Sequence, residues 1–403
     1  MARHTTLDAI RGVAVMGILL ANIVAFGLPE AAYFSPLAWG GSTGADRVAW
    51  FLNYLLVEGR LRGLFSFLFG ASMLLVIDRA EASGEAPGQV HLSRMGWLFA
   101  IGCLHLYLFW WGDILTHYAL VGTVAFLFHR LGARMLVAMA MAFLALSLVQ
   151  GIAGAIALFA SAARSTAAQR AIWEGFASGF GVPPAAHLAA EIAAMRGSFW
   201  DAATWRWQTV LNPLLLAQFL GPETLSAILL GMAGYRSGFV TGAWSRAAYR
   251  RVAVAGIGAA TLGYGAMGIT TMAHGFDPRF VYLGVNVVAA PFRIVGTLGY
   301  AALLVLILRD RARATARLAA VGRMAFSNYL ATTLLMDLVF CGWGLGLFAR
   351  LDRASLYLLV PPVWALMLLW SPWWLRRFAY GPFEWVWRSL TRAELQPFRR
   401  RTT

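Results

Sequence analysis

Two side chains suited to acid–base chemistry, His105 and Asp113, stand close together in an otherwise apolar stretch of the chain. An imidazole can take a proton from a hydroxyl or amine near neutral pH, and a carboxylate beside it orients the ring and stabilises its protonated form. In a continuous helix, these two positions would lie about 80° apart around the axis and about 12 Å along it, out of direct reach. A break at Gly112 is therefore needed to fold the carboxylate back toward the imidazole.

Both residues also have plainer roles, which the residues alone leave open. Asp113 opens a predicted helix, where a carboxylate accepts hydrogen bonds from free backbone amides, and this capping does not exclude chemistry. A single histidine within a membrane segment commonly hydrogen-bonds a neighbouring helix. His117, next to the expected interface, is interpreted as a solvated or headgroup-facing residue.

Further polar side chains lie near the ends or at the depth of the predicted spans. Asp8 and Arg11 share one helix face and predict an ion pair, with phosphate binding as the alternative role of Arg11. Glu58, Arg60 and Arg62 crowd the outer end of a predicted helix, where charges often anchor it. Four more polar residues must face the bundle interior or water, because lipid does not solvate them: Asn22, Arg293, Asn328 and Asp337.

The sequence lacks the motifs of several enzyme classes. It contains no Walker motif, no cluster of metal ligands and no serine nucleophile elbow, so we expect no metal cofactor. Cys103 and Cys341 are lone thiols in apolar segments and predict no disulfide. Glycines at 256–263 and 342–346 are spaced loosely like nucleotide motifs, but in apolar helices they favour close helix packing.

The composition indicates that these residues are carried by the helices of a membrane protein. Hydrophobic residues make up 60% of the 403 positions and charged residues 13%, whereas soluble domains carry about a quarter charged residues. We therefore predict an all-α, polytopic integral membrane bundle of about ten helices, since apolar runs of this length must be helical in lipid. The predicted spans lie near 8–28, 62–78, 95–111, 113–129, 134–162, 206–236, 250–272, 280–308, 320–348 and 355–375.

The placement of arginine predicts the orientation. The net charge is +15 and all 33 basic residues are arginine. Such a charge suggests nucleic acid in a soluble protein, but here it reflects the basic residues that hold cytoplasmic loops inside, and we expect no nucleic-acid partner. If both termini lie in the cytoplasm, the segments that face the cytoplasm are the ones richest in arginine. The placement of arginine therefore predicts that both termini are cytoplasmic. The loop at about 163–205 is then extracytoplasmic, and residues 1–403 form a single transmembrane domain in contact with membrane lipids.

Short motifs follow one another in a definite order along the chain. The motifs are Leu7 to Gly12 (LDAIRG), Glu58 to Arg60 (EGR), Leu64 to Gly70 (LFSFLFG), His105 with Gly112 to Leu115 (GDIL), Gly322 to Ala325 (GRMA), Ser327 to Tyr329 (SNY) and Gly381 to Trp385 (GPFEW). Because of these motifs and their order, the chain resembles the YeiB-like membrane proteins, the domain-of-unknown-function 418 family. Asp337 and His117 are unusual for the pattern, so no function is carried onto them.

This family is similar to a superfamily of transmembrane acyltransferases that includes heparan-α-glucosaminide N-acetyltransferase. The resemblance implies a bacterial inner-membrane enzyme, an acyltransferase-like domain that moves an acyl group, acetyl in the simplest case, from cytoplasmic acetyl-CoA or another acyl-CoA to an extracytoplasmic glycan or glycolipid. It implies His105 as general base and Asp113 as its orienting partner. The other expected roles are CoA binding by Arg11, Arg94 and Arg323, a tunnel lined by Asn22 and Asn328, and acceptor binding by Glu58, Arg60 and Arg62.

Two other classes of function fit the same residues. One is a proton-coupled transporter or exporter in which His105, Asp113 and Arg293 form the path. The other is a membrane scaffold without catalysis. The sequence also leaves open the acyl group, the acceptor, transfer to oxygen or nitrogen, a transient acyl-histidine, and assembly into a homo-oligomer.

Overall fold

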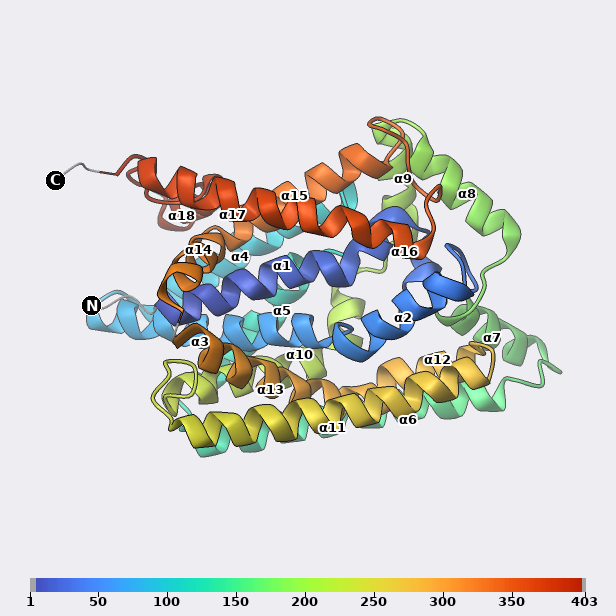
Figure 1. Ribbon diagram of the computed structural model, residues 1–403, viewed down its shortest axis with the longest axis horizontal. Coiled ribbons are helices and arrows are strands. Elements are labelled where there is room, and N and C mark those ends of the chain that lie inside the picture. Colours follow the sequence, from blue (N-terminus) through green and yellow to red (C-terminus); the bar gives the residue numbers. More distant parts are fainter. Residues whose placement is uncertain (1–4, 310, 401–403) are drawn as a thin grey trace.

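The computed structural model describes residues 5–309 and 311–400, which fold into an elongated bundle of helices (Figure 1). Within these ranges the secondary structure is helical, apart from an isolated antiparallel bridge between Phe378 and Arg399. Long apolar runs become helices because a helix satisfies the hydrogen bonds of its own backbone, which lipid cannot do.

The helices that run along the bundle are α1 (Thr5–Gly27), α3 (Arg60–Ala82), α4 (Pro87–Leu108), α5 (Leu115–Ala125), α6 (Ala133–Ala160), α10 (Pro213–Arg236), α11 (Arg246–Ala273), α13 (Ala289–Arg309), α15 (Ala325–Phe340) and α17 (Val360–Arg377). Helix α12 (Pro278–Tyr282) continues through a π-helical segment, η3 (Leu283–Val288), into α13. Short 3₁₀ segments follow α1, α5 and α16: η1 (Glu30–Tyr33), η2 (Phe126–Phe128) and η4 (Tyr357–Leu359).

The remaining helices cover the two ends of the bundle (Figure 1). At one end lie α2 (Gly44–Leu56), α7 (Ala167–Phe180), α8 (Ala185–Arg196), α9 (Phe199–Thr209) and α16 (Arg353–Leu356). At the other end lie α14 (Ala312–Arg323) and α18 (Pro382–Arg392), together with the beginning of α1. We call these the α8 end and the α18 end. The predicted extracytoplasmic loop forms α7, α8 and the start of α9, opposite to the described ends of the chain.

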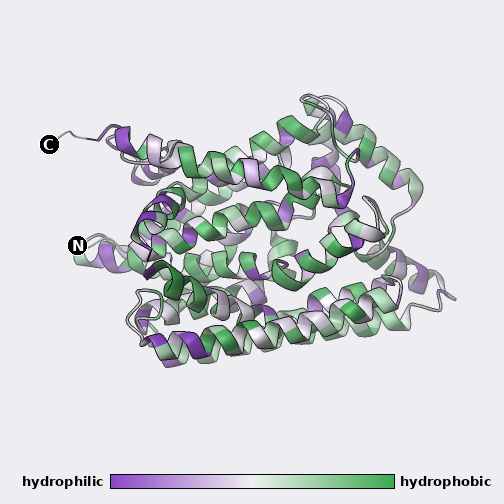
Figure 2. Cartoon of the chain, viewed as in Figure 1, coloured by the Kyte–Doolittle hydropathy of each residue, from purple (hydrophilic) through white to green (hydrophobic). Residues whose placement is uncertain are grey.

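The protein is a polytopic helical membrane protein. In the described part of the chain, seven helical segments are long and apolar enough to cross a membrane by length and composition, and two shorter apolar helices lie at 115–128 and 325–340. Every span predicted from the sequence overlaps a helix. Figure 2 shows apolar residues along the length of the bundle and hydrophilic residues gathered mainly at its two ends.

Some predicted span boundaries are wrong because turns interrupt the apolar runs. The span expected at 206–236 begins only at Pro213, since Asn212 caps α10 by accepting a hydrogen bond from the Leu214 amide at 2.9 Å. The span expected at 320–348 contains the end of α14, the whole of α15 and a non-helical segment after Phe340. The glycines at 256–263 permit close packing as predicted, because a Cβ on Gly256 would lie 2.6 Å from the Val295 carbonyl oxygen.

Helix α1 occupies the centre of the bundle, whereas α6 and α11 lie at its edge. In their most apolar windows 78% of α1 is buried, against 22% of α6 and 28% of α11. Helix α1 packs against α3, α14 and α15. Its close contact with α14 depends on small residues, since a side chain on Gly12 would overlap the Leu318 carbonyl group. The polar side chains considered below therefore have a rigid, protein-lined interior around them.

Candidate functional site

His105 and Asp113 meet inside the bundle, on either side of the link between α4 and α5. The Nδ1 atom of His105 lies 2.8 Å from Oδ1 of Asp113. Both residues are buried, with 4% of each exposed. The other carboxylate oxygen, Oδ2, accepts hydrogen bonds from the backbone amide and the hydroxyl of Thr116, both at 2.8 Å. Asp113 therefore caps α5 and orients His105 at the same time.

The hydrogen bonds determine which ring nitrogen of His105 carries the proton. An ionised carboxylate only accepts, so Nδ1–H donates to Asp113 and Nε2 of a neutral ring is left as an acceptor. The hydroxyl of Thr333 on α15 lies 2.9 Å from Nε2 and can donate to it. The three side chains thus form a line of hydroxyl, imidazole and carboxylate, which is the arrangement that lets an imidazole remove a proton from an oxygen.

The fold-back of Asp113 depends on how α4 ends. The amides of Phe109 and Trp110 both bond to the His105 carbonyl, at 3.0 and 2.9 Å, which closes the last turn of α4. The chain then turns at 109–114 before α5 begins. Gly112 is needed in this turn because a Cβ there would lie 2.5 Å from the Trp110 ring.

Gly102 lets α4 and α5 approach each other closely next to the pair formed by His105 and Asp113. A Cβ on Gly102 would lie 2.5 Å from the Thr116 amide nitrogen, which is itself a donor to Asp113.

Replacing Gly102 with alanine is therefore expected to push the helices apart and to destabilise the protein by about 1–3 kcal/mol, as overpacking of a dense core does. Thermal unfolding measures this effect. The variant Gly96→Ala is the control, because Gly96 lies on the same helix with open space around it, and equal stability of the two variants would contradict the prediction.

A charged network lies on α3, α10 and α13. The Arg293 Nη1 atom donates to both carboxylate oxygens of Glu223, at 2.7 and 2.5 Å, and Nη2 donates to the Val285 carbonyl at 2.9 Å. Arg62 approaches the same carboxylate to 3.8 Å. Glu223 was missed by the sequence analysis, although a carboxylate within an apolar helix is itself a signal of function or of a buried ion pair.

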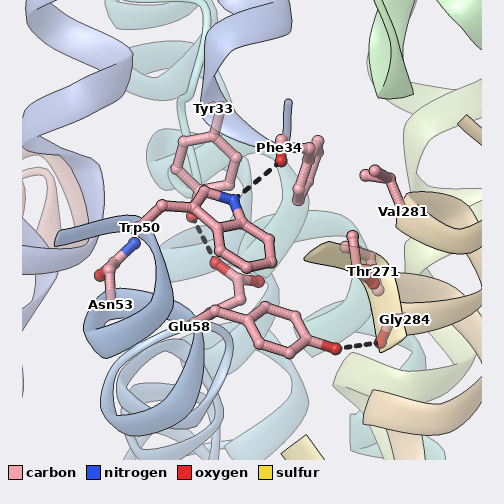
Figure 3. A pocket seen from close by; sticks show the side chains of 10 residues that line it. Tyr33, Phe34, Trp50, Asn53, Glu58, Thr271, Val281 and Gly284 are labelled. Carbon is pink, nitrogen blue, oxygen red and sulfur yellow. Dashed lines mark hydrogen bonds between the residues drawn. The ribbon is translucent and has the colours of Figure 1, made fainter. Parts of the chain in front are cut away.

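The three residues predicted to bind the acceptor lie in or beside this network. Glu58 lines a pocket of aromatic side chains and accepts a hydrogen bond from the Tyr33 hydroxyl at 3.0 Å (Figure 3). Arg60 is 1% exposed, stacks 4.1 Å from the centroid of the Tyr264 ring and donates to the Ala260 carbonyl at 3.1 Å. Arg62 is the exposed member, with 36% of its side chain accessible.

His117 lies elsewhere than the sequence suggested. It is 7% exposed and its Nε2 atom lies 2.9 Å from the Thr224 hydroxyl on α10. The interpretation as a solvated or headgroup-facing residue is therefore wrong, because α5 turns this face inward against α10. His117 lies between the Asp113 site and the Glu223 network and interacts electrostatically with both carboxylates.

The arginines predicted to bind CoA lie at the α18 end. Arg11 donates to Asp8 at 2.9 Å and to the Ser72 hydroxyl at 2.6 Å. Arg94 stacks 4.0 Å from the centroid of the Trp387 ring and interacts electrostatically with Arg11, Arg388 and Arg392. Two of these four arginines come from α18, which the sequence analysis did not assign to the site.

The other residues predicted to line the path to the donor have structural contacts. Arg323 lies near the turn that leads into α18, with Nη2 3.5 Å from the Ala379 carbonyl oxygen. The Asn328 amide donates to the Val321 carbonyl and the Ser371 hydroxyl, each at 3.1 Å, and thereby joins α15 to α14 and α17. Asn22 is half-buried on α1.

Comparison with known proteins adds no biochemical activity. Residues 234–394 match the family described as a protein of unknown function (DUF418). The chain is 33% identical to the uncharacterized protein YeiB of Escherichia coli (strain K12) over 406 residues, which cover 97% of each chain. It is 30% identical to the uncharacterized protein YxaH of Bacillus subtilis (strain 168) over 424 residues, covering 99% of this chain and 97% of that one. No solved structure gives a significant match.

Proposed function

We propose that this chain, which belongs to the YeiB-like DUF418 family of membrane proteins, is a membrane-embedded acyltransferase. It moves an acyl group, acetyl in the simplest case, from cytoplasmic acetyl-CoA or another acyl-CoA to a sugar or glycolipid on the outer side of the bacterial inner membrane. The observation that supports this proposal most directly is the buried line of Thr333, His105 and Asp113.

His105 is the general base in this mechanism. Asp113 holds Nδ1–H, so the Nε2 lone pair removes the proton from the acceptor hydroxyl or amine as that atom attacks the thioester carbonyl. The new bond forms to the acyl carbon, the C–S bond breaks, and the imidazolium returns the proton to the departing CoA thiolate. Thr333 marks the direction of attack, because its hydroxyl occupies the place at Nε2 that the acceptor hydroxyl takes in the reaction.

The donor enters from the α18 end, where the arginines gather. Arg forms forked hydrogen bonds to phosphate and stays charged at every physiological pH, which suits the phosphates of CoA. Arg94 and His105 lie on the same helix, about 16 Å apart along its axis. The thioester arm of CoA therefore runs along α4 to reach the imidazole.

Binding of acetyl-CoA to the detergent-purified protein tests this assignment. We expect saturable binding by the wild type and binding weaker by about tenfold or more in Arg94→Ala and Arg11→Ala, since each loses charge-assisted hydrogen bonds to phosphate. The control is Arg130→Ala, an exposed arginine outside the cluster, which should bind as the wild type does. No binding at millimolar acetyl-CoA would reject CoA as the donor.

A proton-coupled transporter is the second candidate, and the Glu223–Arg293 pair favours it. Charged groups at membrane depth commonly form ion or proton paths, and His117 lies between Asp113 and Glu223. Uptake of a small molecule into proteoliposomes under a pH gradient, without acyl-CoA turnover, would support the transporter over the acyltransferase.

A further inference from the structure

A second cavity adjoins the His105 site on the side of the α8 end. It lies among the end of α1, the link between α4 and α5, and helices α8, α9 and α15. Trp110 lines this cavity and separates it from the imidazole, with ring centroids 6.3 Å apart. A molecule on the outer side that occupies this cavity is thus separated from His105 by the Trp110 ring.

Two buried charged side chains line the cavity without bonding to each other. Asp337 is 4% exposed, and among the described residues its Oδ2 atom has no hydrogen-bond partner. Arg206 is 3% exposed; its Nη1 donates to the Leu108 carbonyl at 2.8 Å, while Nε has no partner in the same part of the chain. A buried acceptor and a buried donor are costly when unpaired. A polar ligand that both donates and accepts would satisfy them together.

The charges and rings of the cavity favour a cation. Besides Asp337, the carboxyl groups of Glu30 and Glu191 line it, and the Glu30 amide donates to Glu191 Oε1 at 2.8 Å. Three tryptophans, whose indole rings can attract cations, also line the cavity: Trp110, Trp111 and Trp205. The charged residues that line the cavity thus comprise three carboxyl groups and one arginine, Arg206.

Burial affects the carboxyl groups that line this cavity. It raises the pKa of the Glu191 carboxyl to about 8 and that of the Glu30 carboxyl to about 7. A bound ammonium favours the ionised form of each carboxyl group and so lowers these pKa values. Asp337 is the most informative residue to change, because it lies on α15 close to Thr333 and therefore to the reacting atoms.

We propose that this cavity binds a primary ammonium group of the acceptor and that the acyl group is transferred to a neighbouring hydroxyl of the same molecule. The inference rests on the acyltransferase function proposed above. Asp337 and Thr333 are one turn apart on α15, about 6 Å along its axis. An ammonium at Asp337 thus places an adjacent hydroxyl near Nε2 of His105.

The same carboxylates decide which atom of the acceptor reacts. They favour the charged form of the amine, which has no lone pair for attack. The hydroxyl instead loses its proton to Nε2, its oxygen bonds to the acyl carbon and the C–S bond breaks. The product is an ester that retains its ammonium group, and CoA leaves as the thiol.

An amino sugar and a small amino alcohol such as free ethanolamine both carry an ammonium next to a free hydroxyl, and binding experiments distinguish them. Calorimetry on the purified full-length protein compares D-glucosamine with D-glucose and ethanolamine with ethylene glycol. We expect at least one amine to bind tenfold or more tightly than its neutral partner, and the tighter amine identifies the source. Asp337→Asn should remove this preference, Glu30→Gln should reduce it, and Glu174→Gln, which removes an exposed carboxylate on α7, should leave it unchanged.

Two results would overturn the cation site: equal binding of amine and neutral partner by the wild type, or an unchanged preference in both Asp337→Asn and Glu30→Gln. The second variant keeps the test decisive if Asp337→Asn does not fold. Labelled acetyl-CoA then tests the product. An ester, cleaved by hydroxylamine, supports the proposal, and an amide contradicts it. Amine-selective binding without any transfer would reject the acyltransferase and its ester product while retaining the cation site.

Discussion

Replacing His105 with alanine is expected to lower acyl transfer by about 10²–10⁴-fold, the usual contribution of a positioned general base. Acetyl-CoA binding should stay near the wild-type level, because the arginines of the α18 end lie far from the imidazole. Asp113→Asn should also lower transfer strongly, since its amide can donate to Nδ1 and so favour the wrong tautomer. Transfer of labelled acetyl groups to the acceptor measures both effects.

A matched histidine change separates the chemistry from general damage. His274→Ala removes an exposed imidazole at the α8 end and should retain wild-type transfer. Full activity in His105→Ala would reject the mechanism. Incubation of the wild type with labelled acetyl-CoA in the absence of acceptor further distinguishes direct transfer from a transient acyl-histidine, because only the latter leaves label on the protein.

Replacing Arg293 with alanine is expected to lower the free energy of unfolding by about 3–5 kcal/mol, because Glu223 would lose both of its short hydrogen bonds and keep only Arg62, at 3.8 Å, as a charged neighbour. The side chain of Arg293 is 3% exposed and that of Glu223 16%, so water can replace little of the lost interaction. The variant also loses the bond to the Val285 carbonyl, which lies in the π-helical segment. Thermal unfolding in detergent, followed by tryptophan fluorescence, measures the change.

An exposed ion pair of the same chemical type provides the control. Arg279 pairs with Asp277 at 2.9 Å, and their side chains are 33% and 25% exposed. Arg279→Ala should therefore change stability by about 0–1 kcal/mol, as surface pairs do. If Arg293→Ala were no more destabilising than Arg279→Ala, the buried pair would not support the fold as inferred. Replacing both Glu223 and Arg293 by apolar residues should recover much of the loss, since neither charge of the buried pair is then left without the other, and Arg62 is partly accessible to water.

The sequence predicts the helices of this protein well, because lipid leaves a long apolar run no alternative to a helix. It predicts the ends of helices less well. Residues 206–236 show the reason: α9 ends at Thr209 and the Asn212 side chain caps the start of α10, inside a segment that composition alone predicts as one span. The fold-back of Asp113 onto His105 depended likewise on local turn geometry at 109–114.

Partners distant along the chain could not be predicted at all. Thr333 lies 228 positions from His105, and Glu223 lies 70 positions from Arg293. A threonine in an apolar helix carries no signal of its own, since its hydroxyl can bond to its own backbone. His117 was misinterpreted for a related reason, because only the packing of α5 against α10 shows that it faces inward.

The central position of α1 has a consequence for biogenesis. Helix α1 leaves the ribosome before the other described helices, yet α14 and α15, which pack against it, are synthesised about 300 residues later. At the 5–20 residues per second of synthesis, this delay lasts roughly 15–60 s. During that interval α1 must be shielded by lipid or by insertion factors. The contacts of α1 with α14 and α15 therefore form late. A nascent chain that stops before α14 leaves this side of α1 uncovered.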